Sequence, residues 1–256
     1  MQFKDLHHQT HPLLICNVWD VASARGAEKI NFQALGTSSS AIASMLGYKD
    51  GEQMSFVELE YIVKRIVSNV SIPVSVDLES GYSRDVSKII DHIQRLAHLG
   101  ITGINIEDSL VENKRTLLEA ENFAKTLSSV KAQLKDDGID IFLNVRTDAF
   151  LLQHPDPVKE TCSRILLYEK SGADGIFTPC IEKEGDIKHI VETTDLPVNV
   201  MCMPDLPDFD TLRSLGVKRI SMRNFLFDHI QKGFKNTLKS VSAQGSFNPV
   251  FKHADH

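Results

Sequence analysis

The sequence predicts a single (β/α)8 barrel of the TIM type with C-terminal helices, and three observations carry this prediction. Eight short apolar segments alternate with stretches of helical periodicity. No linker, low-complexity tract or break in composition divides the chain, so residues 1–256 are expected to form one domain. Charged residues gather where the apolar segments end, and barrels keep their functional sites at that edge.

The predicted elements follow one another in a regular order. The expected strands are Leu13–Val18, Ala34–Thr37, Val74–Asp77, Gly103–Ile106, Ile141–Val145, Gly175–Thr178, Val198–Met201 and Arg219–Met222. Apolar residues at helical spacing predict helices between them, among them Val57–Ser68, Val86–Leu99, Leu117–Leu134, Val158–Lys170 and Phe209–Leu215. Pro73 and Pro197 each precede a strand, where a sheet tolerates proline.

The two ends of the chain are expected to lie outside the barrel repeat. Residues 1–12 form a polar segment whose histidines, His7, His8 and His11, are interpreted as a frayed terminus rather than a metal site. Residues 224–256 are expected to form a helix and a tail. The helix carries an apolar stripe at helical spacing, which predicts either subunit contacts or closure of the chain's own barrel.

Composition narrows the class of protein. Hydrophobic residues make up 42% of the chain and charged residues 24%, which is typical of a soluble globular protein. A net charge of −6 argues against a nucleic-acid or anionic-membrane partner, and no apolar run is long enough to span a membrane. Four cysteines without a CxxC pair indicate a reduced, cytoplasmic setting.

Acidic residues dominate the strand ends. Period-two alternation predicts that Asp77 and Glu79 lie on the same side of their strand, and Glu107 ends the next one, with Asp108 turned away from it. Adjacent carboxylates repel one another unless a cation lies between them, and Mg²⁺ needs only a few. Asp77, Glu79 and Glu107 are therefore the predicted metal ligands, for Mg²⁺ or Mn²⁺.

Basic and hydroxyl residues complete the predicted pocket. Arg146 offers a fork for a carboxylate or phosphonate, and an ion pair with Glu107 or Asp148 is the alternative. The serine run Ser38–Ser40 offers hydroxyl and backbone N–H donors to another anionic oxygen. The strand-end residues Trp19 and Asn199 are further candidates for contact with a substrate.

Several motifs in order resemble the isocitrate lyase/phosphoenolpyruvate mutase superfamily, in its phosphonomutase-like branch. The resemblance extends roughly from Leu13 to Phe227. Its motifs are Asn17-Val18-Trp19-Asp20, Thr37-Ser38-Ser39, Leu46-Gly47-Tyr48-Lys49-Asp50-Gly51, Asp77-Leu78-Glu79-Ser80-Gly81-Tyr82, Gly103-Ile104-Asn105-Ile106-Glu107-Asp108, Asn144-Val145-Arg146-Thr147-Asp148, Gly172-Ala173-Asp174-Gly175-Ile176-Phe177 and Pro197-Val198-Asn199-Val200-Met201.

The resemblance implies an Mg²⁺-dependent enzyme that acts on small 2-oxo or phosphono acids through an enolate of the pyruvate type. It implies that Asp77 contacts the metal most directly, while Asp50, Glu79 and Glu107 hold it mostly through waters. Asp50, Arg146 and Glu107 then form the catalytic set. Ser38 and Ser39 hold the carboxylate of the substrate. The family also exchanges C-terminal helices between subunits, which predicts a homodimer or homotetramer.

The chain also departs from the lyase pattern. Lyase members carry a catalytic cysteine on a lid after the fourth strand, whereas this chain has no cysteine between Cys16 and Cys162. The segment after Asp108 is expected to be short and to lead straight into a helix. Oxaloacetate decarboxylation, 2-oxo acid aldol cleavage and phosphonopyruvate hydrolysis remain open as activities. A Schiff-base aldolase ranks low because no strand ends in lysine. A non-catalytic metabolite-binding protein that kept the metal pocket is the remaining alternative.

Overall fold

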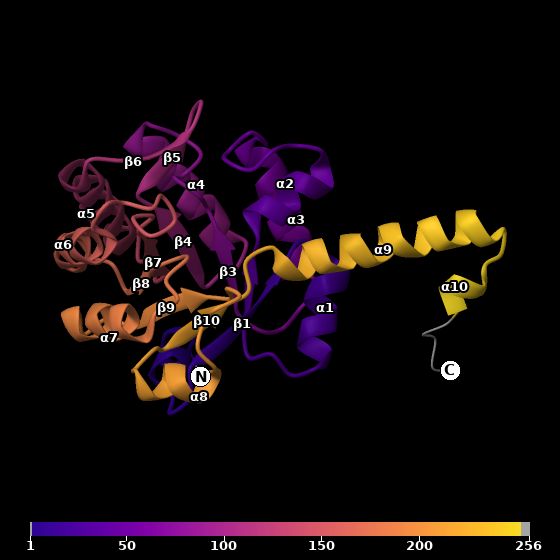
Figure 1. Ribbon diagram of the computed structural model, residues 1–256. Helices are drawn as coiled ribbons and strands as arrows, with labels where there is room; N and C mark the ends of the chain where they lie inside the picture. Colours follow the sequence, from indigo (N-terminus) through magenta and orange to yellow (C-terminus); the bar gives the residue numbers. More distant parts are fainter. Residues whose placement is uncertain (1, 252–256) are drawn as a thin grey trace.

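The computed structural model describes residues 2–251 and confirms the predicted barrel (Figure 1). Eight parallel strands close in the order β1-β10-β9-β8-β7-β4-β3-β2. Their bounds are β1 Leu13–Val18, β2 Leu35–Thr37, β3 Val74–Asp77, β4 Gly103–Glu107, β7 Phe142–Arg146, β8 Gly175–Phe177, β9 Val198–Met201 and β10 Arg219–Ser221. The predicted strands agree with these bounds to within about one residue, because each is a short apolar run ended by polar residues.

Helices surround the barrel and cover the outward face of its strands (Figure 1). Their bounds are α1 Val21–Lys29, α2 Ser39–Leu46, α3 Phe56–Val67, α4 Val86–His98, α5 Ala120–Asp136, α6 Pro157–Lys170, α7 Glu184–Thr193, α8 Phe209–Ser214, α9 Phe225–Gln244 and α10 Asn248–Phe251. Outward-facing strand residues such as Ile104, Ile106, Leu143 and Val145 are fully or almost fully buried in one hydrophobic cluster with residues of these helices. The alternate residues point into the barrel, and the last ones along each strand reach its carboxyl end.

The amino-terminal segment is not frayed, which corrects the expectation for His7. Residues Lys4–His8 form a short 3-10 helix, η1, in which Leu6 and His7 are buried. The His7 ring stacks on Phe142 of β7 with 4.2 Å between centroids, and Phe3 meets the same ring edge-on. Burial first, and the charge of Arg219 second, lower the pKa of His7 to about 3, so this histidine is a neutral core residue.

The segment after Asp108 does not lead straight into a helix, which corrects a second expectation. It forms an antiparallel hairpin, β5 Ser109–Val111 and β6 Arg115–Leu117, before α5 begins at Ala120. The hairpin rises above the carboxyl ends of the strands (Figure 1), and its Val111 lies against Gly51 of the loop after α2. It therefore lies where the resembled family has its lid.

The last long helix leaves the barrel instead of covering it. Helix α9 projects away from the strands, with α10 at its far end (Figure 1). Its apolar stripe stays open to solvent, since Ile230 is 53% exposed and Phe234 59% exposed. The stripe therefore does not close the chain's own barrel. Within residues 2–251, no helix is both long and apolar enough to cross a membrane.

Candidate functional site

A polar pocket of about 280 Å³ opens at the carboxyl ends of the strands. Its walls combine acidic, basic and hydroxyl side chains from most strands of the barrel. The residues that line it are Asn17, Ser38, Ser39, Ser40, Asp50, Asp77, Asn105, Arg115, Arg146, Leu151, Leu152, Phe177, Pro179, Met201, Ser221 and Arg223. The pocket thus lies where the sequence predicted it, and five of the predicted site residues line it: Ser38, Ser39, Asp50, Asp77 and Arg146.

Asp77 is held firmly at the end of β3. Its backbone N–H donates to Oγ1 of Thr37 at 2.9 Å, and the Ser39 hydroxyl donates to its Oδ2 at 2.7 Å. Ser39 is the first residue of α2, and Ser38 caps that helix by accepting a hydrogen bond from the N–H of Ala41. The amino terminus of α2 and the Asp77 carboxylate are therefore fixed side by side in the pocket.

Asp50 reaches the same pocket from the loop after α2. The loop packs tightly on the hairpin, because a Cβ on Gly51 would lie 2.8 Å from Cβ of Val111, and Gly51 has a φ of +98°. Desolvation in the pocket first, and the charge of Asp77 second, raise the pKa of Asp50. The two carboxylates therefore repel each other, which a bound cation would relieve.

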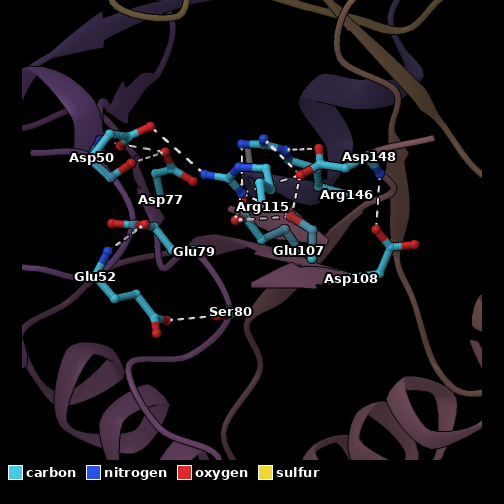
Figure 2. Close-up of polar contacts among 12 residues, drawn as sticks. Asp50, Glu52, Asp77, Glu79, Ser80, Glu107, Asp108, Arg115, Arg146 and Asp148 are labelled. Atoms are coloured by element: carbon cyan, nitrogen blue, oxygen red, sulfur yellow. Dashed lines mark hydrogen bonds and ion pairs between the residues drawn. The ribbon is translucent and has the colours of Figure 1, made fainter. Parts of the chain in front are cut away.

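The predicted three-carboxylate metal set does not converge. Within residues 2–251 no group of three or more His, Cys, Asp or Glu side chains is arranged to hold a metal. Asp50 and Asp77 remain, with the Ser39 hydroxyl beside them (Figure 2). This donor set fits Mg²⁺, which commonly binds one or two carboxylates and keeps several waters.

Glu79 departs from the predicted alternation. Strand β3 ends at Asp77, and Glu79 has a φ of +51°, so the period-two rule no longer applies to it. Its Oε2 accepts the Glu52 N–H at 2.9 Å (Figure 2). Its Oε1 accepts the Tyr82 hydroxyl at 2.9 Å. Burial first, then the charges of Glu107 and other nearby carboxylates, raise the pKa of Glu79 to about 9. Glu79 anchors the loop that carries Asp50.

Replacing Glu79 by glutamine is expected to flatten the dependence of stability on pH. The folded pKa of about 9 exceeds the ordinary value of 4.5, so the proton that Glu79 holds stabilises the fold. That contribution is fully present below pH 4.5 and is lost as pH rises through about 9. In metal-free urea unfolding at pH 8, we expect Glu79→Gln to be more stable than wild type by on the order of 2 kcal/mol.

The matched control is Glu192→Gln, which alters an exposed glutamate in an ion pair with Lys188. It should show the wild-type dependence on pH. Equal slopes from pH 5 to 9 in wild type and Glu79→Gln would contradict the assignment. A loss of Mg²⁺ affinity in Glu79→Gln would instead restore Glu79 to the metal set.

Arg146 is tied into the wall of the pocket by two carboxylates. Its Nε and Nη2 donate to Asp148 at 2.6 and 3.1 Å, and its Nη1 lies 2.9 Å from Oε2 of Glu107. Burial alone would raise the pKa of Asp148, but the charge and hydrogen bonds of Arg146 lower it. Burial raises the pKa of Glu107, and the charge of Arg146 opposes that rise. Arg146 thus pairs with both of the acids, Glu107 and Asp148, that the sequence analysis named as its possible partners.

Arg115 is a pocket residue that sequence reasoning missed. It extends from β6 of the hairpin and forms an ion pair with Glu107, with further contacts to Asp148 at 3.3 Å and Asp50 at 3.8 Å (Figure 2). Only 16% of its side chain is exposed. The segment Ser109–Leu117 shows no strict alternation of apolar and polar residues, so no clear local signal pointed to the hairpin that carries Arg115.

Asp108 supports the site from outside the barrel wall. It is turned away from Glu107, as predicted, and accepts the Asp148 N–H at 2.9 Å (Figure 2). Its other oxygen accepts Arg164 at 3.0 Å and the Tyr168 hydroxyl at 2.8 Å, both from α6. This buried network fixes the backbone of Asp148 and, through it, the orientation of Arg146.

Two predicted substrate contacts do not line the pocket. Trp19 packs edge-on against Phe227 of α9, with 5.2 Å between ring centroids. Asn199 is fully buried and lies two residues before the pocket-lining Met201 on β9, which places it one layer deeper in the barrel. Neither residue is therefore among those that line the pocket.

The arrangement defines a (β/α)8 barrel with an acidic and arginine-rich pocket for a small molecule. The phosphoenolpyruvate phosphomutase family model matches residues 3–242. The chain therefore belongs to the phosphoenolpyruvate mutase family, within the isocitrate lyase/phosphoenolpyruvate mutase superfamily. This confirms the resemblance seen in the sequence motifs.

Individual relatives agree with this assignment. An uncharacterised protein of Mycobacterium tuberculosis H37Rv is 33% identical over 221 residues, which is 86% of this chain and 81% of the relative. An oxaloacetate decarboxylase of Pseudomonas savastanoi is 27% identical, covering 79% of this chain and 70% of its own length. A provisionally assigned phosphonomutase structure from Burkholderia cenocepacia has a TM-score of 0.88 at 32% identity, covering 93% and 97% of the two chains.

Proposed function

We propose that this protein is an Mg²⁺-dependent enzyme that cleaves a C–C or C–P bond of a small 2-oxo acid through an enolate of the pyruvate type. One observation carries the proposal: the carboxylates of Asp50 and Asp77, the amino terminus of α2 and the guanidinium of Arg146 line a single pocket of about 280 Å³. Such a pocket suits a divalent cation together with a small anionic substrate.

Asp77 and Asp50 would hold the cation, with Asp77 kept in position by the Ser39 hydroxyl. When bound, Mg²⁺ supplies Lewis acidity that polarises a 2-oxo group and stabilises negative charge on its oxygen. Manganese has similar ligand preferences and should replace it. Glu79 would act indirectly, by anchoring the loop of Asp50 through the Glu52 N–H.

The substrate carboxylate would bind between α2 and Arg146. Serines at the start of α2 offer N–H and hydroxyl donors, and a helix amino terminus favours an anion. Three of the five N–H donors of Arg146 contact Asp148 and Glu107, which leaves two for the substrate. Cleavage of the bond between carbon 3 and the departing carbon or phosphorus leaves its electron pair on carbon 3, delocalised as an enolate onto the 2-oxo oxygen. The leaving group departs as CO2, as an aldehyde or, after attack by water, as phosphate, and a proton from solvent then adds at carbon 3 to give pyruvate.

Oxaloacetate decarboxylation ranks first among the reactions, because relatives at 27% identity carry that name. Phosphonopyruvate hydrolysis and 2-oxo acid aldol cleavage are the other candidates. Isocitrate and methylisocitrate are not expected to react, since residues 109–117 of the hairpin contain no cysteine that could serve as the lyase acid.

The test is a turnover assay that detects pyruvate, with succinate measured as well for isocitrate and methylisocitrate. Oxaloacetate, phosphonopyruvate and a 4-hydroxy-2-oxo acid would each be incubated with Mg²⁺, with Mn²⁺ and with a chelator, against isocitrate and methylisocitrate as negative controls. We expect pyruvate from at least one of the first three, and only with a metal. Turnover at the same rate in chelator, or cleavage of isocitrate, would refute the proposal.

A non-catalytic metabolite-binding protein is the second candidate. The observation that favours it is Arg115, whose guanidinium contacts the carboxylates of Asp50, Glu107 and Asp148 in a hairpin that contains no cysteine. Binding of oxalate in the presence of Mg²⁺, without turnover of any substrate in the panel, would support this candidate over the enzyme.

We also propose that the protein assembles through α9 into a dimer or tetramer. Because α9 projects away, a groove of about 330 Å³ remains beside β10 and β1, lined mainly by apolar side chains such as Leu14, Ile220 and Phe225. The exposed stripe of α9, which includes Ile230 and Phe234, has the apolar character to fill such a groove on a second copy.

Replacing Phe234 by aspartate is therefore expected to shift the protein to a monomer. A charge in the centre of an apolar contact costs several kcal/mol, so micromolar assembly should be lost. Light scattering at micromolar concentration measures the mass. The control is Asn236→Asp, which adds the same charge on another side of the helix. A monomeric wild type would contradict the proposal.

A further inference from the structure

Arg223 occupies an unusual position at the mouth of the pocket. It lies two residues after the end of β10 and lines the pocket together with Ser221 of that strand. Its φ is +55°, in the left-handed region that side chains with a Cβ rarely adopt. Bulky residues persist there only where the surroundings hold them, and such positions cluster at functional sites.

Arg223 also differs from the other two arginines of the pocket in its partners. Arg146 and Arg115 are both paired with Glu107 and Asp148. Arg223 forms no ion pair with any carboxylate among residues 2–251, and its guanidinium instead lies 5.6 Å from the centre of the Phe225 ring. The pocket thus contains one guanidinium whose charge is not matched by a neighbouring acid.

The charge of Arg223 acts inside the pocket. Burial raises the pKa of Cys180, at the end of the β8 segment, and the charge of Arg223 opposes that rise. It opposes the rise at Asp50 as well. The guanidinium therefore lies within electrostatic range of Asp50, which lines the pocket with it.

We propose that Arg223 is the specificity-determining residue for a second anionic group of the substrate. This inference rests on the proposed function. Arg223 lines the same pocket from β10, a strand that β8 and β9 separate from β7 and that β1 separates from β2. If the carboxylate next to the 2-oxo group lies at α2 and Arg146, Arg223 is the remaining guanidinium for a second anionic group. The substrate class is then a 2-oxo acid with a distal carboxylate or phosphonate, and monoanionic 2-oxo acids are poor ligands.

The test compares ligands with and without the distal group, in the presence of Mg²⁺. Oxalate serves as the core ligand, while 3,3-difluorooxaloacetate and phosphonopyruvate carry a distal carboxylate and phosphonate. By calorimetric titration, Arg223→Gln should bind the two longer ligands at least about tenfold more weakly, the loss typical of a charge-assisted hydrogen bond. Its oxalate affinity should stay unchanged. The longer ligand with the larger loss identifies the distal group.

Two further variants separate binding from folding. Arg223→Gly should lose the same affinity, yet its melting temperature should equal or exceed that of wild type, because glycine adopts a φ of +55° without strain. Arg223→Lys should recover part of the affinity. The control Arg213→Gln, which alters an exposed arginine of α8 paired with Asp210, should bind every ligand as wild type does.

The outcomes distinguish this inference from the proposed function. Equal losses for oxalate and the longer ligands in Arg223→Gln, or no loss for either, overturn the role of Arg223 and leave the proposed function standing. Failure of the wild type to bind oxalate or the longer ligands with Mg²⁺ overturns both.

Discussion

Replacing Asp77 by alanine is expected to abolish Mg²⁺ binding and nearly all activity. Asp77 is the acidic residue that β3, Thr37 and Ser39 together hold in the pocket. Without it, Asp50 alone faces the pocket from an exposed loop. Loss of a Lewis acid that contributes about 4 kcal/mol to the transition state lowers kcat/KM about a thousandfold.

Calorimetric titration with Mg²⁺ measures the first effect, and the pyruvate assay measures the second. Asp208→Asn is the control, because Asp208 caps the exposed start of α8 and asparagine caps equally well. The control should bind Mg²⁺ as wild type does. Retention of Mg²⁺ binding by Asp77→Ala would move the metal site to the remaining carboxylates of the pocket.

Replacing Arg146 by alanine is expected to cause the largest loss of stability among single changes in the pocket. Asp148 is fully buried and Glu107 is 2% exposed, and both would lose a guanidinium. Breaking a buried pair from one side typically costs about 3–5 kcal/mol, and Arg115, which pairs with both carboxylates, offsets part of that cost. For a domain of this size, the melting temperature should fall by roughly 5–10 °C.

Binding provides a second measure of the same variant. Arg146→Ala should still bind Mg²⁺, and slightly more tightly, because a nearby positive charge has gone. Oxalate should bind more weakly by about 1.5–3 kcal/mol, the worth of a charge-assisted contact. The control Arg95→Ala removes an arginine whose pair with Glu60 is partly exposed, and it should leave oxalate binding intact. A variant that loses Mg²⁺ but keeps oxalate would reverse the roles assigned to Asp77 and Arg146.

Some residues of the site could be predicted from the sequence of a single strand. Asp77 and Arg146 each end an apolar run, and parallel strands bring their carboxyl ends to one edge, so local pattern is enough to gather them. Successive side chains of a strand point to opposite faces, which correctly predicted that Asp108 points away from Glu107. Glu79 did not follow this alternation, because its left-handed backbone lies beyond the end of β3.

The remaining parts of the site depend on contacts between distant segments. Arg115 enters the pocket because the hairpin folds over the ends of β4 and β7. There its guanidinium forms ion pairs with the carboxylates of Glu107 and Asp148. The sequence analysis predicted neither the hairpin nor the direction in which it folds. His7 is similar, since its burial comes from the ring of Phe142, more than a hundred residues away.

The barrel, the order of its strands and the edge at which charged residues lie could be predicted from the sequence alone. These features follow from the periodic pattern of apolar residues, which depends only on residues close together in the chain. The pairing of each acid with an arginine, and the face of α9 that is exposed to solvent, are known only from the folded structure. Those outcomes depend on burial, and burial is set by every segment that packs around a side chain rather than by the residues next to it in the chain.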